Sequence, residues 1–320
     1  MRWRTPLRTS TVTRRVAHEP LRRGGAWRGG EYFVARPATA RGVLRHMEIN
    51  SLSKKLLFNT VRVDTELEDG SAGSGTAFVV SHAHVRGNHT FIVTNRHLVE
   101  NVRRGGLVFT QKRGGRPLIG QRFELHIDDF PHAWFLHPDP ETDLAIIPMR
   151  PLEQAAREQG LELYYHVIDT CLVPDAAALY ALDALEEVLF VGYPSGVWDQ
   201  VNLMPILRRG TTATPMVLDF EGRPEFLIDA AVYPGSSGSP VFIYQPDTLR
   251  PRQILRRKFL FAGVIAAVFF REEANHVVPA PVPANDAGVV VGSEMIDLGL
   301  VIKAQAVIDI INAYLGKWAE

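Results

Sequence analysis

Short runs of apolar and β-branched residues recur along this chain from residue 57 to residue 303, and Gly, Pro, Asn and Asp separate them. Runs of this length and composition, bounded by turn-forming residues, indicate β-strands. Many short strands with turn signals between them are typical of a β-barrel or a β-sandwich. The pattern therefore predicts an all-β protein. Its expected strands include Gly75–Ser81, His89–Asn95, Glu187–Pro194, Met216–Phe220 and Phe259–Phe270.

Helical patterns are scarce and fall in three segments. Residues 151–160 have Pro near the start and Gly at the end, which is the usual polarity of a helix. Residues 175–188 form a second candidate, and residues 303–316 a third. The third has the i, i+3, i+4, i+7, i+8 spacing of a helix docked by one apolar face. That face comprises Val307, Ile310, Ile311, Tyr314 and Leu315.

The N-terminal segment differs in composition from the rest of the chain. Residues 1–46 carry eleven Arg and no Lys against two Glu, whereas residues 47–320 carry 24 basic and 33 acidic residues. A segment rich in Arg, Gly and Pro without apolar periodicity is expected to be disordered. Three interpretations of it stay open: a sequence upstream of a true start at Met47, a basic tail, or an organelle transit peptide.

The charge and hydropathy of the chain argue against two classes of binding partner. The net acidic body of the chain is a poor surface for nucleic acid. The longest apolar run, residues 259–270, is too short to cross a bilayer and suits a buried strand or hairpin. We therefore expect no nucleic-acid partner and no membrane partner, and the oligomeric state stays open.

Cysteine and histidine usage argues against disulfides and metal. Cys171 is the only cysteine, so an internal disulfide is excluded, and its apolar neighbours predict a buried thiol without a catalytic role. With no apolar run like a secretory signal, this leads us to expect a cytoplasmic protein. His82, His84 and His89 lie close together but lack Cys or carboxylate partners at a recognisable metal spacing. We predict no metal and no cofactor.

Three serines within four residues, at positions 236, 237 and 239, raise the question of a nucleophile. Gly235-Ser236-Ser237-Gly238 is followed by Ser239 and Pro240, so the strand–turn–helix elbow with Gly-x-Ser-x-Gly does not fit. In the alternative pattern Gly-x-Ser-Gly-[Gly/Ser]-Pro, the N–H groups of Gly235 and Ser237 would bind a developing oxyanion. Ser237 is then the predicted nucleophile.

A nucleophilic serine needs a base, and the base needs an acid that orients it. His97 directly follows an apolar run that ends in Thr-Asn, and Asp143 directly precedes another apolar run. Both positions lie at a predicted strand end. The order His97, Asp143, Ser237 is the chymotrypsin-type order and not that of the α/β-hydrolases.

These segments resemble the trypsin-like serine peptidases, specifically the bacterial HtrA/Deg-type branch without a PDZ domain. The resemblance implies two perpendicular six-stranded β-barrels with a C-terminal helix, and hydrolysis of peptide bonds through an acyl-enzyme in the cleft between the barrels. Residues 47–160 would form the first barrel, with His97 and Asp143, and residues 161–320 the second, with Ser237. The matching segments are Gly73–Val80, Thr94–Glu100, Asp143–Met149, Val191–Gly196, Asp229–Pro240, Ala262–Val268 and Gly299–Ile311.

The chain also departs from this family. The insertions around residues 102–135 and 271–296 have no clear counterpart, and Val277–Asp286 is expected to be an exposed flexible loop. Digestive trypsins have Asp where Ser236 stands, so activation by a new N-terminus is not expected.

The resemblance places Ala231 at the base of the pocket for the P1 side chain, with Ala266, Ala267 and Val268 on its wall. Without an acid at the base, we expect small or medium apolar P1 residues rather than Arg or Lys. The predicted function is serine endopeptidase acting on polypeptides. Two alternatives stay open, a latent peptide-binding module that needs a partner for activation and an esterase for small esters.

Overall fold

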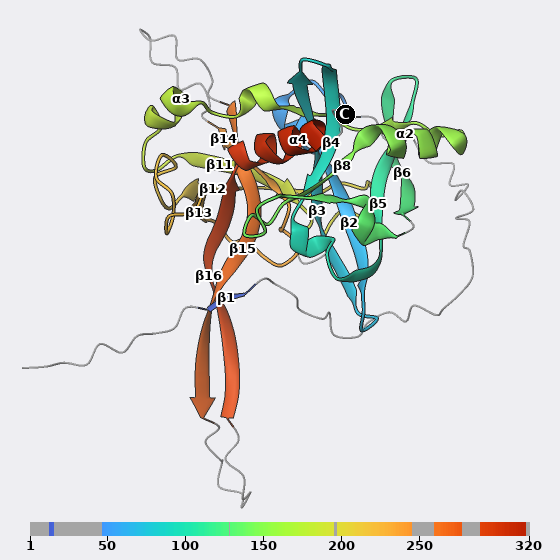
Figure 1. Ribbon diagram of the computed structural model, residues 1–320. Helices are drawn as coiled ribbons and strands as arrows, with labels where there is room; N and C mark the ends of the chain where they lie inside the picture. Colours follow the sequence, from blue (N-terminus) through green and yellow to red (C-terminus); the bar gives the residue numbers. More distant parts are fainter. Residues whose placement is uncertain are drawn as a thin grey trace, which may run out of the picture.

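The computed structural model describes residues 13–15, 47–127, 129–194, 197–244, 259–276 and 289–317. Most of the N-terminal segment and the loop Val277–Asp286 therefore lie outside the described residues, and the disorder expected of them stays a prediction. The described part of the chain is built mainly from two β-sheets (Figure 1).

The C-terminal half forms a closed six-stranded barrel. Its strands follow the order β15-β14-β11-β12-β13-β16, and β16 pairs again with β15 to close the ring. The long hairpin of β15 and β16 continues beyond the barrel as a two-stranded ribbon (Figure 1). The strands are β11 (Glu187–Gly192), β12 (Ile206–Thr212), β13 (Glu225–Asp229), β14 (Pro240–Tyr244), β15 (Phe259–His276) and β16 (Val289–Lys303). A short N-terminal strand, β1 (Thr13–Arg15), pairs with β15.

The N-terminal half forms the second sheet, in the order β6-β5-β2-β3-β4-β8-β7. Two short strands extend it, since β9 (Leu163–Tyr164) pairs with β5 and β10 (Ile168–Asp169) pairs in parallel with β3. The other strands are β2 (Thr60–Leu67), β3 (Ala72–His84), β4 (Gly87–Thr94), β5 (Val102–Arg113), β6 (Arg116–Ile127), β7 (Phe135–Leu136) and β8 (Ala145–Pro148). The proposed division of the chain at residues 160 and 161 stays a prediction.

The described residues also form four α-helices and three 3₁₀ turns. They are α1 (Leu52–Leu56), η1 (Arg96–Leu98), η2 (Phe130–Ala133), α2 (Met149–Glu158), η3 (Thr170–Leu172), α3 (Ala176–Tyr180) and α4 (Gln305–Lys317). The all-β class and the C-terminal helix are thereby confirmed.

Helix α4 packs into the core that joins the two sheets. Its residues Val307, Ile310, Ile311 and Leu315 are buried, as the apolar spacing predicts. Tyr314 lies edge-on against Phe91 and Phe135 of the N-terminal sheet. The same core contains residues of β3, β4 and β8 together with residues of β14, β15 and β16. A continuous apolar core therefore runs from one sheet to the other.

Strands β3 and β4 read as nearly continuous apolar runs because both of their faces are buried. Phe78 and Phe91 point into the core shared with α4, whereas Val79 and Ile92 point into a second core inside the N-terminal sheet. A strand covered on both sides needs no polar alternation.

Three details of the sequence prediction were wrong. Met216–Phe220 forms no strand, because Leu218 N–H bonds the carbonyl of Pro215 in a turn that buries only Met216. The second helix is confined to α3, since the chain then turns into the barrel, where Thr212 N–H bonds the Glu186 carbonyl. Cys171, expected to be buried, is exposed in η3.

Candidate active site

His97 and Asp143 meet where two paired strands end. β4 and β8 are antiparallel neighbours with Thr94 opposite Ala145, so the residues after β4 lie beside those before β8. His97 Nδ1 lies 2.6 Å from Asp143 Oδ2, and the main-chain N–H of His97 donates to Asp143 Oδ1 at 2.9 Å. The side chain of Asn95 donates to the Asp143 carbonyl at 2.8 Å. The carboxylate thus orients the imidazole and favours the tautomer with hydrogen on Nδ1.

An ion pair within the same turn holds η1 in place. Arg96 Nε and Nη2 donate to the two carboxylate oxygens of Glu100 at 2.8 and 3.0 Å. This bond lowers the pKa of Glu100 and raises that of Arg96. Both groups are therefore charged at neutral pH, and the pair steadies the turn that carries His97.

Ser237 follows a tight turn. Ser236 N–H bonds the Tyr233 carbonyl at 3.0 Å, and Gly235 has a φ of 85°, as the third residue of a type II turn with Pro at the second position requires. Gly238 has a φ of 81° and its N–H bonds the Ile265 carbonyl of β15 at 2.9 Å. The turn therefore rests on the barrel directly after the predicted nucleophile.

The three serines differ in access to solvent. Ser237 is 8% exposed, whereas Ser236 and Ser239 are each 1% exposed. The hydroxyls of Ser236 and Ser239 are buried and lack a hydrogen-bond partner among the described residues. Only Ser237 among the three thus combines a place in this turn with measurable exposure.

The N–H groups of the turn alternate between bonded and unbonded. Ser236, Gly238 and Ser239 each donate to a main-chain carbonyl. Within the described part of the chain, the N–H groups of Gly235 and Ser237 donate to no partner. Two unbonded donors separated by one residue are what an oxyanion site requires.

A main-chain bond joins this turn to β3, and a side-chain bond joins β3 to β4, the strand that precedes His97. The N–H of Thr76 in β3 donates to the Ser237 carbonyl at 3.0 Å, and the Thr94 hydroxyl of β4 donates to the Thr76 carbonyl at 2.7 Å. Thr94 lies three residues before His97. The sequence analysis missed Thr76, although it lies within the segment Gly73–Val80 that carried the resemblance.

The predicted P1-pocket residues do not share one environment. Ala231 is half-buried, and Ala266, Ala267 and Val268 are all buried. Ala266 packs into the core that joins the sheets, Val268 into the barrel core, and Ala267 into a small cluster with Leu227. A bulge in β15 between Ile265 and Ala267 interrupts the side-chain alternation there. Their role in specificity stays a prediction.

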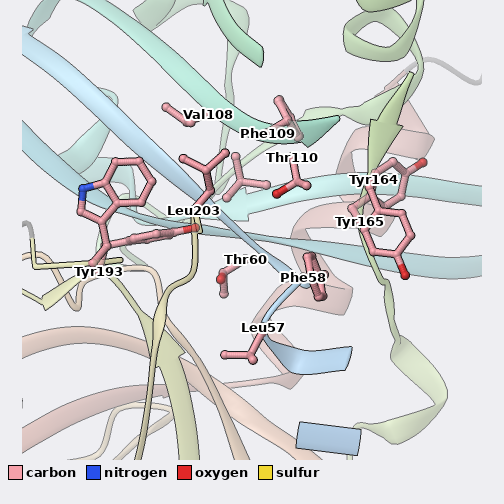
Figure 2. Close-up of a pocket in the computed structure, with 12 residues that line it drawn as sticks. Leu57, Phe58, Thr60, Val108, Phe109, Thr110, Tyr164, Tyr165, Tyr193 and Leu203 are labelled. Carbon is pink, nitrogen blue, oxygen red and sulfur yellow. The ribbon is translucent and has the colours of Figure 1, made fainter. Parts of the chain in front are cut away.

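A small enclosed cavity in the described part of the chain is lined by none of the residues His97, Asp143 and Ser237. Figure 2 shows it lined by Phe58 just before β2, Phe109 of β5, Tyr164 of β9 and Tyr193 after β11. Its volume of about 10 Å³ is about the room of one water molecule. Burial raises the pKa of the Tyr193 hydroxyl in its wall. A cavity of this size is too small for a peptide side chain.

The clustered histidines His82, His84 and His89 have local contacts. His82 Nδ1 lies 2.9 Å from the Thr170 hydroxyl, and the ring centroids of His84 and His89 are 6.1 Å apart. Across the described ranges, no three His, Cys, Asp or Glu side chains are grouped to hold a metal ion. Nor does this part of the chain contain a helix of the length and apolarity needed to span a membrane.

A closed six-stranded barrel joined to a second sheet, with an Asp-held histidine and a serine turn at their junction, is the architecture of the chymotrypsin-like serine peptidases. The family described as trypsin-like peptidase domain matches residues 75–245, which is more than half of the chain. The protein therefore belongs to this family.

Solved structures with a related fold are distant in sequence. The HtrA-type protease AlgW with a tripeptide is 14% identical, with 82% of this chain and 61% of that chain covered and a TM-score of 0.42. The Rv3671c protease from M. tuberculosis in its active form is 18% identical, with 80% and 81% covered and a TM-score of 0.38. The thermostable serine protease AL20 is 12% identical, with 80% and 97% covered and a TM-score of 0.41. The match to AlgW thus spans 61% of that protein's length, and no curated protein sequence matches this chain.

Proposed function

We propose that this protein is a serine endopeptidase that acts through a triad of Ser237, His97 and Asp143, with the N–H groups of Gly235 and Ser237 as its oxyanion hole. The observation that carries the proposal is the pair of unbonded N–H groups on either side of Ser236. The Asp143–His97 bond and the exposure of Ser237 support the same assignment. The expected cytoplasmic location remains a prediction.

The chemistry divides into acylation and deacylation. His97 Nε2 takes the proton of Ser237 as the hydroxyl oxygen attacks the carbonyl carbon of the scissile peptide bond. The oxygen of that carbonyl gains negative charge and accepts bonds from the two N–H groups. The imidazolium, stabilised by Asp143, then protonates the leaving amine. A water molecule hydrolyses the resulting acyl-enzyme by the same steps, with His97 again as the base.

For the substrate, we propose a preference for small or medium apolar residues in P1. The support is the residue type at position 231, where Ala offers neither charge nor bulk, together with the small side chains at 266–268. A library of peptides with every P1 residue, incubated with the protein and read by mass spectrometry, tests this preference. Cleavage mainly after Arg or Lys would contradict it.

Active-site labelling tests the triad. The full chain is incubated with a fluorophosphonate probe, and the adduct is mapped by mass spectrometry in wild type and in Ser237→Ala and His97→Ala. Ser236→Ala and Ser239→Ala are the matched controls, since they remove buried hydroxyls two residues or fewer away. We expect one adduct, on Ser237, that both controls retain and His97→Ala loses.

Two outcomes would overturn the assignment. An adduct on Ser236 or Ser239 would move the nucleophile, and labelling that persists in His97→Ala would remove the histidine from the role of base. A folded wild type without any adduct would mean that the site is latent, and would revive the interpretation of a module that a partner must activate.

A further inference from the structure

The side chain of Thr76 links three parts of the molecule. Thr76 is in β3 of the N-terminal sheet and is completely buried. Its hydroxyl donates to the Gly235 carbonyl at 3.1 Å and accepts the Tyr193 N–H at 3.1 Å. Tyr193 directly follows β11 of the barrel, and Gly235 belongs to the serine turn. One hydroxyl therefore joins the sheet, the barrel and the turn.

Thr76 bonds the turn at two places. Its hydroxyl holds the carbonyl of Gly235, and its main-chain N–H holds the carbonyl of Ser237 at 3.0 Å. These two carbonyls lie on either side of Ser236, in the same short segment that presents the unbonded N–H groups of Gly235 and Ser237. Because peptide groups are planar, anchoring two carbonyls restricts the torsions that aim the neighbouring N–H groups.

The Thr76 hydroxyl is closely packed. A Cβ atom on Gly192 would overlap the hydroxyls of both Thr76 and Ser239. A Cβ atom on Gly238 would overlap the Thr76 carbonyl and crowd the Thr94 hydroxyl. Loss of the Thr76 hydroxyl would leave the Gly235 carbonyl and the Tyr193 N–H without this bond.

We propose that Thr76 is a positioning residue that aims the oxyanion hole through its hydroxyl, by holding the Gly235 carbonyl against the barrel. This inference rests on the proposed function, because it assumes that Ser237 attacks and that the Gly235 N–H binds the oxyanion. Thr76 itself touches no substrate atom. Thr76 aims groups that bind the oxyanion of the transition state. Substitution of Thr76 should therefore change the rate of reaction more than the binding of the reagent.

Thr212 provides a matched control in the barrel. Its hydroxyl accepts the Glu186 N–H at 2.9 Å and donates to the Ala184 carbonyl at 2.8 Å. Thr212 is 1% exposed and is therefore about as buried as Thr76. Its hydroxyl also makes the same number of hydrogen bonds. Its partners, however, lie in the connection before β11 and not in the serine turn. Substitution by Val removes two comparable bonds at either position while nearly keeping the volume.

The experiment compares the full-length wild type with Thr76→Val, Thr76→Ser and Thr212→Val. A fluorophosphonate probe is used over a range of concentrations, so that the maximal rate of phosphonylation of Ser237 and the probe concentration at half-maximal rate are obtained separately. We expect Thr76→Val to lower the maximal rate on the order of tenfold to a hundredfold, below the effect of losing a whole oxyanion donor. The half-saturating concentration should change less than about twofold. Thr76→Ser and Thr212→Val should react as wild type.

Thermal unfolding of the same variants separates stability from positioning. The Tm values of Thr76→Val and Thr212→Val should fall by similar amounts, because each variant loses the same kind of hydrogen bonds. If Thr76→Val does not fold, Thr76→Ala is compared with Thr76→Ser instead. Equal maximal rates for Thr76→Val and Thr212→Val would overturn the inference while the proposed function stands. A wild type without an adduct on Ser237 would overturn both.

Discussion

The carboxylate of Asp143 binds His97 at two points, the ring Nδ1 at 2.6 Å and the main-chain N–H at 2.9 Å. The carboxylate thus controls both the position of the backbone and the orientation of the ring. Because β4 and β8 are adjacent strands, this pair is a product of sheet pairing rather than of a flexible loop.

Asp143→Asn should nearly abolish turnover. The amide cannot accept at both positions with equal strength, and its NH₂ group facing Nδ1 would favour the wrong tautomer of His97. We expect kcat to fall on the order of 10⁴-fold with little change in KM. Steady-state hydrolysis of a fluorogenic peptide measures both. Asp139→Asn, which alters an exposed carboxylate bonded to Thr142 in the same loop, should keep kcat. A kcat for Asp143→Asn within tenfold of wild type would contradict the prediction.

Gly238→Ala should fail to fold or lose most of its stability. The added Cβ would overlap the Thr76 carbonyl, which is main chain and cannot move aside. Gly222→Ala separates the two causes, since Gly222 has a similar φ of 75° but open space around its Cβ position. We expect Gly222→Ala to cost about 1–2 kcal/mol of unfolding free energy. Urea unfolding followed by tryptophan fluorescence gives both values, and equal losses would show that the overlap does not matter.

Stability should depend on His166 below neutral pH. Burial lowers the pKa of His166 from its usual 6.5, and the nearby charge of Lys55 has a smaller effect in the same direction. The unfolded chain then binds more protons in the window just below pH 6.5, so the unfolding free energy falls as the pH falls through that window. His166→Gln should show a smaller drop in Tm than wild type between pH 7.5 and pH 5. His126→Gln, at an exposed position of β6, should follow wild type.

An unchanged pH dependence in His166→Gln would contradict the role given to burial. The other histidines are present in both proteins, so only the difference between the variant and wild type is informative. Full-length protein in matched ionic strength keeps the exposed charges equally screened.

Cys171 should be slow to alkylate despite its exposure. Its thiol bonds Asp169, which raises the thiol pKa and so lowers the fraction of reactive thiolate. Asp169→Asn removes the negative charge and should speed the reaction with iodoacetamide several-fold at pH 8. Intact mass measured over time gives the rate. Equal rates in the two proteins would show that the carboxylate does not control this thiol.

Much of the fold could be predicted from the sequence, because the local pattern of apolar residues indicates which strands and which helix face are buried. Strands β3, β4, β11 and β15 stand out as apolar runs, and the apolar spacing of α4 matches its buried face. Strand β12 did not stand out, because it contains Arg208, Arg209 and Gly210. Its place in the barrel depends on pairing with β11 and β13, which no local pattern records.

By itself the sequence determined the strand-rich class, the serine turn and the order of His97, Asp143 and Ser237. These features depend on residue type and on spacing within a few positions. Gly and Pro help to identify them, because each of these residues has its own conformational preferences. Only the tertiary structure decided which serine is accessible, which N–H groups stay unbonded, and that the Thr76 hydroxyl reaches a carbonyl 159 residues away. The physical reason is that such contacts arise where two sheets pack together, and the cost and gain of each depend on partners that are distant in the chain.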